Sequence, residues 1–238
     1  MKTGIVLPSF QDHPDLALEV ARQAEEAGVD GVFCYDHLWP MGRPDRPAIA
    51  PFPLLAAIAR MTTRVCVGTL VARIGLVPDA VLCSEFAALD WLAPGRVIAG
   101  LGTGDRLSAA ENVAYGIAFD TPHERRESLV AVARELRGRG IAVWIGGGAA
   151  RTVAVAEDQG VALNLWGATP AVVADQTKRT EVTWAGPTPT APDGQVDEAA
   201  TGDLVSAVAA AGATWAVFGW PAPLEVLVAG SGRSAGRR

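Results

Sequence analysis

Short apolar runs alternate with amphipathic segments along the whole chain. The apolar runs predict strands at residues 4–8, 31–35, 64–72, 97–101, 142–145, 162–166, 181–184 and 214–218. Helical periodicity and helix start or stop residues predict helices at 15–27, 52–61, 78–92, 123–137, 150–158, 170–178, 202–211 and 221–228. Eight strand–helix pairs in succession predict an α/β fold of the (β/α)8 TIM-barrel type, with an open doubly wound sheet as the alternative.

Composition limits the class of protein further. We expect a single barrel domain over residues 1–230 and a disordered tail at 231–238, because no break in composition divides the chain. The net charge of -6 argues against a nucleic-acid partner, and no apolar run reaches the roughly 18 residues of a membrane span. The 3 cysteines lack a CxxC spacing and the N-terminus lacks a signal-peptide pattern, so we expect a cytoplasmic protein with reduced thiols.

Candidate chemistry gathers where the predicted strands end, which is where barrels of this kind carry their active sites. Asp36 and His37 follow the second strand, and a glycine-spaced turn places Asp105 after the fourth. The glycine triplet 146–148 follows the fifth strand and leads into a helix, whose first N–H groups can bind an anion. An acid at one strand end and an anion cradle at another predict a site for a phosphate-bearing ligand.

Other common chemistries are disfavoured by the residue types. Lys2 precedes the first strand and Lys178 lies near a helix end, so neither is placed to form a Schiff base. No pair among the 3 histidines has a metal-ligand spacing, so we expect no metal site. The chain has no GxSxG sequence, which argues against a serine hydrolase of the α/β type. A flat cofactor is the hypothesis that remains.

A set of ordered motifs runs through residues 1–167. They lie at 35–39 (YDHLW), 68–69 (GT), 85–96 (EFAALDWLAPGR), 100–105 (GLGTGD), 115–119 (YGIAF), 125–129 (RRESL) and 144–147 (WIGG). In this order they resemble the luciferase-like monooxygenase superfamily, whose members are (β/α)8 barrels that bind FMN or the 5-deazaflavin coenzyme F420. The Asp36-His37 pair and the Gly-Thr-Gly-acid turn are more similar to the F420-dependent oxidoreductases of that superfamily.

The resemblance implies roles for individual residues. His37 and Asp105 are the implied catalytic residues, each handling a proton. The implied cofactor contacts are Asp36, Gly68, Thr69, Leu70, Val71, Gly102, Thr103, Gly104, Gly146, Gly147, Gly148, Arg151, Thr152 and Trp166. Residues 68–71 match the segment that, in relatives, carries a non-proline cis peptide behind the cofactor ring.

Each implied role has a structural alternative. His37 either shuttles a proton or hydrogen-bonds a neighbouring strand end. Asp105 either protonates the substrate, holds the cofactor or caps a short helix. Asp36 either orders its loop or bonds the edge of the ring. The glycine triplet 146–148 either cradles a phosphate or permits close helix–strand packing, and Trp166 either stacks on the ring or fills the barrel core.

The chain is shorter than members of the superfamily, because the helix at 123–137 joins the strand at 142–145 directly and the family insertions are largely missing. We therefore expect an open, wet pocket, which disfavours oxygen activation and favours a large, natural-product-like substrate. The resulting hypothesis is an F420-dependent reductase or dehydrogenase that transfers a hydride between the deazaflavin and a C=N or C=C bond.

Four further expectations complete the sequence analysis. The first alternative function is an FMN-dependent luciferase-like monooxygenase, and the second is a non-catalytic flavin-binding barrel. A third is an unrelated phosphate-handling barrel. It is disfavoured because such barrels usually place the phosphate after strands seven and eight, whereas the glycine triplet 146–148 follows the fifth strand. Relatives are commonly dimers, and the apolar helices at 52–61 and 81–92 are the expected interface of a homodimer.

Overall fold

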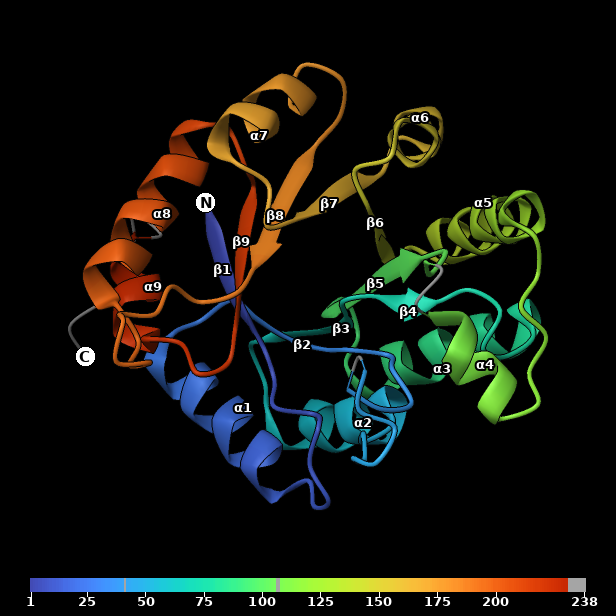
Figure 1. Cartoon of the computed structure of the whole chain (residues 1–238), viewed down its shortest axis with the longest axis horizontal. Helices are drawn as coiled ribbons and strands as arrows, with labels where there is room; N and C mark the ends of the chain where they lie inside the picture. Colours follow the sequence, from blue (N-terminus) through green and yellow to red (C-terminus); the bar gives the residue numbers. More distant parts are fainter. Residues whose placement is uncertain (41, 106–107, 231–238) are drawn as a thin grey trace.

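Parallel strands form a closed barrel in the computed structural model, which describes residues 1–40, 42–105 and 108–230. The strands are β1 (Lys2–Val6), β2 (Gly31–Cys34), β3 (Cys66–Thr69), β4 (Ala72–Arg73), β5 (Val97–Gly102), β6 (Ala142–Gly146), β7 (Ala162–Trp166), β8 (Val182–Gly186) and β9 (Trp215–Gly219). The ring closes because β1 pairs with both β2 and β9, and β3 pairs with β5. Figure 1 shows the strands at the centre and the helices around them. The predicted barrel is confirmed, and the open sheet is wrong.

The helices follow the strands in the predicted order. They are α1 (Asp15–Ala27), α2 (Pro51–Met61), α3 (Asp79–Leu92), α4 (Ala109–Ala114), α5 (Pro122–Gly138), α6 (Ala150–Gln159), α7 (Pro170–Gln176), α8 (Glu198–Ala210) and α9 (Leu224–Gly230). Helix α8 begins four residues before the predicted start, because the Asp197 side chain accepts a hydrogen bond from the Ala200 N–H at 2.9 Å and caps the helix there. Helix α4 lies between the predicted strand at 97–101 and the predicted helix at 123–137, in a segment that we predicted to be a loop because it showed neither a strand nor a helix pattern.

The strand predicted at 64–72 is wrong as one continuous strand. It is divided into β3 and β4, which lie end to end beside β5, and the Leu70–Val71 peptide between them is cis. Glycines on the neighbouring strands make room for this bulge: a Cβ on Gly100 would lie 2.1 Å from the Thr69 carbonyl oxygen, and one on Gly102 would lie 2.4 Å from Val71 Cγ2. The glycine-spaced motif therefore has a packing role at the break.

The barrel interior is filled by aromatic side chains below the mouth. The Phe33 and Trp144 rings stack with centroids 5.1 Å apart, and Trp144 meets Trp215 edge-on at 5.3 Å. Phe33 fits because a Cβ on Gly4 would lie only 2.9 Å from its ring. A second apolar core, which includes Ile5, lies between the strands and the helices. These rings separate the space at the carboxyl ends of the strands from a hollow at the amino ends, which Lys2, Cys66 and Trp215 line.

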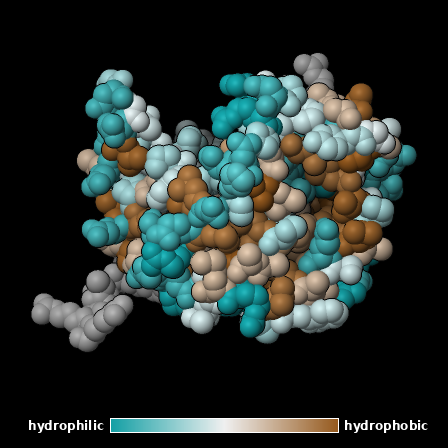
Figure 2. All heavy atoms as spheres, turned by 90° about the horizontal axis from the view of Figure 1, so that it is seen from below, coloured by the Kyte–Doolittle hydropathy of each residue, from teal (hydrophilic) through white to brown (hydrophobic). Residues whose placement is uncertain are grey.

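The outer surface keeps the short connections expected from the sequence. Residues 139–141 alone join α5 to β6, as predicted. This connection lies at the amino end of β6, beside Lys2 and Trp215 and on the face of the barrel opposite the strands' carboxyl ends, so its shortness does not open the mouth as we expected. The segment 231–238, expected to be a disordered tail, lies outside the described residues. Within the described ranges, the helices lack the combination of length and apolarity that a bilayer crossing requires. Figure 2 shows one face of the molecule, where apolar side chains lie among hydrophilic ones.

Candidate active site

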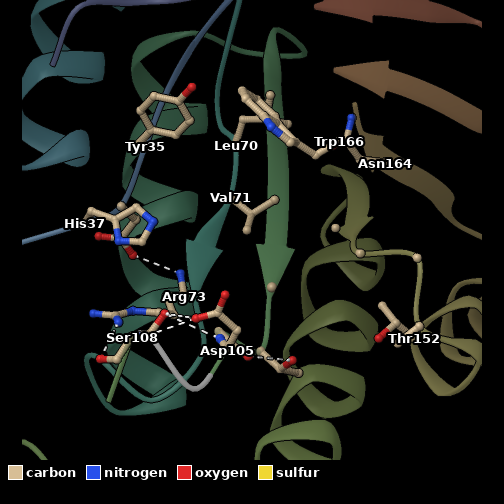
Figure 3. Close-up of a pocket in the computed structure, with 18 of the residues that line it drawn as sticks. Tyr35, His37, Leu70, Val71, Arg73, Asp105, Ser108, Thr152, Asn164 and Trp166 are labelled. Carbon is tan, nitrogen blue, oxygen red and sulfur yellow. Dashed lines mark hydrogen bonds between the residues drawn. The ribbon is translucent and has the colours of Figure 1, made fainter. Parts of the chain in front are cut away.

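A cavity of about 620 Å³ opens at the mouth of the barrel, where the strands end. The sequence-predicted residues that line it are Asp36, His37, Leu70, Val71, Gly102, Thr103, Gly104, Asp105, Gly146, Gly147, Gly148, Thr152 and Trp166 (Figure 3). Phe10, Tyr35, Arg73 and Ser108 also line it, together with Ala149 and Asn164. Closing the ring has thus brought together side chains from strand ends that are far apart in the sequence.

The Leu70–Val71 bulge forms the floor of this cavity. Val71 lies centrally in Figure 3, between His37 on one side and Thr152 on the other. Its two methyl groups lie against strand glycines, because a Cβ on Gly146 would lie 2.8 Å from Val71 Cγ1 and one on Gly102 would lie 2.4 Å from Cγ2. An apolar floor that protrudes between two polar walls suits a flat, mostly apolar ring.

Gly68 and Thr69 do not line the cavity, although the resemblance implied cofactor contacts for both. Gly68 lies within β3, where a Cβ would be 2.3 Å from the Ile98 carbonyl oxygen. The Thr69 hydroxyl donates a hydrogen bond to the Gly100 carbonyl at 2.7 Å and is fully buried. Both residues hold the bulge from behind, since they join β3 tightly to β5.

Asp36 ties the end of β2 to β4. Its Oδ2 accepts a hydrogen bond from the Arg73 backbone N–H at 2.9 Å (Figure 3). Burial raises the pKa of the Asp36 carboxyl, while the Arg73 hydrogen bond and the charges of Arg73 and His37 act in the opposite direction. Asp36 therefore orders its loop, and its neighbour His37 is held at the edge of the cavity.

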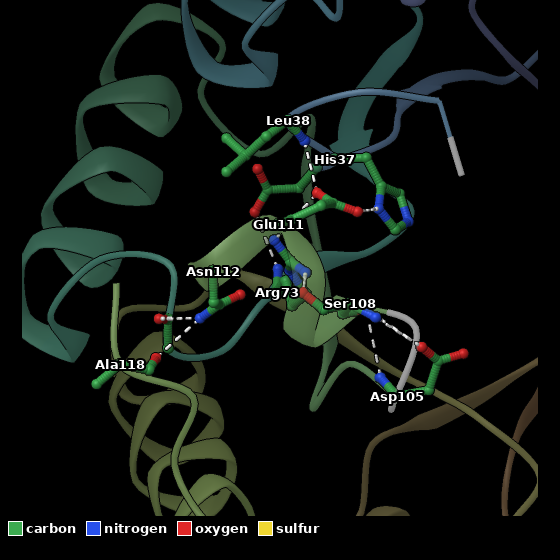
Figure 4. Close-up of polar contacts among 10 residues, drawn as sticks. His37, Leu38, Arg73, Asp105, Ser108, Glu111, Asn112 and Ala118 are labelled. Atoms are coloured by element: carbon green, nitrogen blue, oxygen red, sulfur yellow. Dashed lines mark hydrogen bonds and ion pairs between the residues drawn. The ribbon is translucent and has the colours of Figure 1, made fainter. Parts of the chain in front are cut away.

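His37 is paired with a carboxylate that sequence analysis missed. The Nδ1 atom of His37 lies 2.8 Å from Glu111 Oε1, on α4 (Figure 4). Glu111 is only 1% exposed, and its Oε2 accepts hydrogen bonds from the Leu38 N–H at 2.8 Å and from Arg73 Nη2 at 3.2 Å. Arg73 is 4% exposed, and burial lowers the pKa of its guanidinium. No local signal indicates this cluster, because Glu111 lies in a segment expected to be a loop.

Asp105 lines the cavity and also supports the start of α4. Its Oδ1 accepts hydrogen bonds from the Ser108 N–H at 3.1 Å and from the Ser108 hydroxyl at 3.3 Å. These contacts hold the turn that leads into α4, whose N-cap is Ser108, so Asp105 orders this turn without being the N-cap of α4. The Ser108 carbonyl in turn accepts a hydrogen bond from Arg73 Nη1 at 3.0 Å, so the Asp105 turn and the histidine cluster share α4 as their support.

The glycine triplet lies at the start of α6, on the opposite side of the floor from His37 (Figure 3). Gly147 has a φ of 126°, a backbone conformation that other residues adopt only with strain, and its N–H donates to the Asn164 carbonyl at 3.0 Å. The N-cap residue Ala149 offers no side-chain hydrogen bond to α6. Backbone donors of this helix start are therefore available to an anion in the cavity.

Arg151 does not reach this cavity. It lies in a groove between α5 and α6 together with Arg126, Glu127 and Ala154. Successive helix residues point about 100° apart, so Arg151 faces α5 when its neighbour Thr152 faces the mouth. The placement of the Arg151 side chain therefore does not support the cofactor contact that the resemblance implied for it.

Aromatic rings form the remaining wall. Phe10 stacks on Tyr35 with centroids 5.5 Å apart, and Trp166 meets Tyr35 edge-on at 6.0 Å. Trp166 is 50% exposed at the rim, so it does not fill the barrel core. Burial raises the pKa of Tyr35 to about 12, which keeps its hydroxyl neutral near pH 7. The aromatic wall and the apolar floor border a slot with His37 on one side and the start of α6 on the other.

Comparisons with known proteins agree with this geometry. A family model described as luciferase-like monooxygenase matches residues 1–193. An F420-dependent glucose-6-phosphate dehydrogenase of Kineococcus radiotolerans is 36% identical over 138 residues, which cover 58% of this chain and 40% of that protein. An F420-dependent hydroxymycolic acid dehydrogenase of Mycobacterium tuberculosis is 33% identical over 135 residues, or 56% of this chain and 37% of that protein.

The matched part of the chain thus spans about two fifths of the length of these curated relatives. Among solved structures, an F420-dependent secondary alcohol dehydrogenase in complex with an F420–acetone adduct is similar, with a TM-score of 0.80. That alignment covers 100% of this chain and 99% of the other at 15% sequence identity. At this identity the likeness shows a shared fold.

Proposed function

Because this chain belongs to the luciferase-like monooxygenase family, we propose that it is an oxidoreductase that uses coenzyme F420. The observation that carries the proposal is the arrangement of the mouth cavity, in which an apolar floor separates an anion cradle from a histidine (Figure 3). The names of the relatives from Kineococcus radiotolerans and Mycobacterium tuberculosis, which include F420, favour this cofactor over FMN.

The residues of the cavity fit such a cofactor. The N–H groups of Gly148 and of the first residues of α6 would hold its phosphate, with Gly147 setting the turn and the Thr152 hydroxyl beside them. Leu70 and Val71 would support its ring. When bound, a deazaflavin supplies a hydride donor or acceptor that exchanges two electrons at once. The chain's own contribution is to bind and orient the reactants and to move the accompanying proton.

We propose that His37 moves this proton. Among the described residues, the ring of His37 is hydrogen-bonded at Nδ1, to Glu111, and meets Tyr35 edge-on; it also lines the cavity. A neutral imidazole can take a proton from a substrate hydroxyl, and an imidazolium can return one in the reverse direction. Asp105 is the second proposed proton carrier, in addition to its hydrogen bonds with Ser108.

The substrate part of the proposal is an organic molecule large enough to help cover the ring. Trp166 is half exposed at the rim of the cavity, and the aromatic wall of Tyr35 and Trp166 suits an apolar body. The reacting bond expected from the sequence is C=N or C=C. Because the relatives are named dehydrogenases, substrates with an alcohol or carbonyl group belong in the same test.

The decisive experiment is a fluorescence titration of the protein with F420 and, separately, with FMN, followed by anaerobic hydride-transfer assays on imines, enones and secondary alcohols. We expect micromolar binding of F420 and a loss of turnover of about 10²- to 10⁴-fold in His37→Ala. Tight binding of FMN alone, with oxygen consumption in a separate aerobic assay with reduced FMN, would instead support a monooxygenase. Binding of F420 with no turnover on any substrate would support a non-catalytic barrel.

Asp105 has its own test, because asparagine keeps the oxygen that accepts the hydrogen bonds of Ser108 before α4 and loses the charge. If Asp105 carries a proton, Asp105→Asn lowers turnover while the melting temperature stays near that of the wild type. Unchanged turnover in Asp105→Asn would leave this residue with its role in the turn before α4 only.

We also propose a homodimer through α2 and α3. Large apolar side chains remain exposed on these helices, with Trp91 at 79% and Met61 and Val81 each at 44%. Side chains of this size are enriched at protein interfaces. Sedimentation velocity tests the proposal: the wild type should sediment as a dimer and Trp91→Glu as a monomer. A wild-type protein that sediments as a monomer at every protein concentration measured would contradict the proposed homodimer.

A further inference from the structure

We propose that Glu111 is a positioning residue that fixes the tautomer of His37, so that Nδ1 carries the hydrogen and Nε2 presents a lone pair to the cavity. The proposal rests on the proposed function for its kinetic consequence, but the tautomer itself is a property of the protein without cofactor or substrate. It assigns a role to a carboxylate that lies behind the histidine and does not line the cavity.

The first observation is the pairing itself. Glu111 Oε1 lies 2.8 Å from His37 Nδ1, and a carboxylate can only accept hydrogen bonds. A neutral His37 must therefore bear its hydrogen on Nδ1 to satisfy this contact. The opposite ring nitrogen, Nε2, makes no hydrogen bond to the part of the chain that the structure describes, and His37 lines the cavity. The lone pair of Nε2 is thus available to a substrate hydroxyl.

The second observation is that Glu111 cannot turn away. Its Oε2 accepts from both the Leu38 N–H and Arg73 Nη2, and the side chain is almost fully buried. Arg73 is fixed in turn by the Ser108 carbonyl and, through its backbone N–H, by Asp36. Figure 4 shows the cluster spanning the end of β2, β4 and α4. The orientation of the carboxylate is therefore set by three elements of the fold.

An amide in place of the Glu111 carboxylate would reverse the hydrogen bond to His37. In Glu111→Gln, two N–H donors, from Leu38 and Arg73, still point at the Oε2 position. The amide oxygen satisfies them there, and the NH2 group then faces His37 Nδ1. The imidazole must now accept at Nδ1 and carry its hydrogen on Nε2. This substitution keeps the shape of the side chain and inverts the tautomer, which removes the base from the cavity.

Nitrogen NMR of the 15N-histidine-labelled full chain, without cofactor and at a pH at which the rings are neutral, tests this directly. We expect a protonated Nδ1 for His37 in the wild type and a protonated Nε2 in Glu111→Gln. The matched control is Glu127→Gln, which alters another Glu–His pair: His123 Nε2 lies 3.6 Å from Glu127 Oε1, with side chains 72% and 66% exposed. It should leave the His37 signals unchanged.

Kinetic measurements distinguish a loss of His37 positioning from a general loss of protein stability. With F420 and a turning-over substrate, Glu111→Gln should lower kcat by about 10²- to 10⁴-fold while the Kd for F420 stays within about twofold. In the His37→Ala background the same substitution should have no further effect, since Glu111 acts only through the histidine. Glu127→Gln should match the wild type.

Two results would overturn the inference. One is a wild-type spectrum with the hydrogen on Nε2 of His37, which needs no variant to fold. The other is a Glu111→Gln enzyme that loses the same factor of kcat with and without His37. If no substrate turns over at all, the proposed function fails, whereas the NMR result still decides the tautomer.

Discussion

Replacing Gly102 by alanine puts a methyl group where the bulge of the cavity floor already lies. A Cβ at position 102 would be 2.4 Å from Val71 Cγ2, against an optimal carbon–carbon separation of about 3.5–4.0 Å. The overlap exceeds 1 Å, and overpacking of this kind costs about 1–3 kcal/mol. At about 2–4 °C per kcal/mol for a chain of this size, the melting temperature should fall by roughly 2–12 °C.

A double-mutant cycle with Val71→Ala identifies the cause. Alanine at position 71 keeps only the Cβ, which would lie 3.5 Å from the new Cβ at position 102, an ordinary contact. We therefore expect Gly102→Ala to destabilise the wild type by about 1–3 kcal/mol and the Val71→Ala protein by much less. The assay is thermal or denaturant unfolding of the four proteins under one condition.

The matched control is Gly138→Ala at the end of α5, where nothing lies within 4 Å of the added Cβ. It should be as stable as the wild type or slightly more so, because alanine restricts the unfolded chain. The reasoning is refuted if Gly102→Ala has the same melting temperature as the wild type. It is also refuted if Gly102→Ala lowers the free energy of unfolding equally in the wild type and in the Val71→Ala protein.

Three further predictions concern single positions. Gly147→Ala should weaken the binding of F420 and FMN about tenfold in fluorescence titration, because its φ of 126° strains any other residue. Burial raises the pKa of Asp36 above its ordinary 3.8, so the folded protein loses stability as the pH rises through that higher value. Asp36→Asn does not titrate, so it should melt above the wild type at pH 7, with the difference vanishing below pH 3.8 in a series of melting curves. Thr121→Ala removes the capping box that Thr121 forms with Glu124, and should cost about 1 kcal/mol in denaturant unfolding without changing cofactor affinity.

Sequence patterns were sufficient for the order of the elements. The predicted helix at 15–27 matches α1 because its apolar positions repeat with helical periodicity and Gly28 ends it in the left-handed conformation. The place of the site also followed from sequence, since the predicted strand ends at Asp36, Asp105 and the glycine triplet line one cavity. These features depend on neighbours in the sequence, which is why they can be read from it.

The break between β3 and β4 could not be predicted from residues 64–72 alone. Residues 64–72 are mostly apolar and predict one strand, yet the strand breaks after Thr69. The break depends on glycines 100, 102 and 146, which belong to other strands and leave space for Val71. Arg151 is a similar case, because only the packing of α6 against α5 decides which side of the helix faces the mouth.

The amino-acid sequence by itself determined the eightfold alternation of strands and helices apart from α4 and the β3–β4 break, the closed-barrel class and the edge at which the chemistry lies. The tertiary structure decided which side chains act on one another there. Glu111 and His37 are 74 residues apart and carry no shared motif. They meet because β3 and β4 lie next to β5 in the closed ring, so that α4 lies against the end of β2. Such a contact depends on the packing of distant elements, and no pattern of neighbouring residues specifies it.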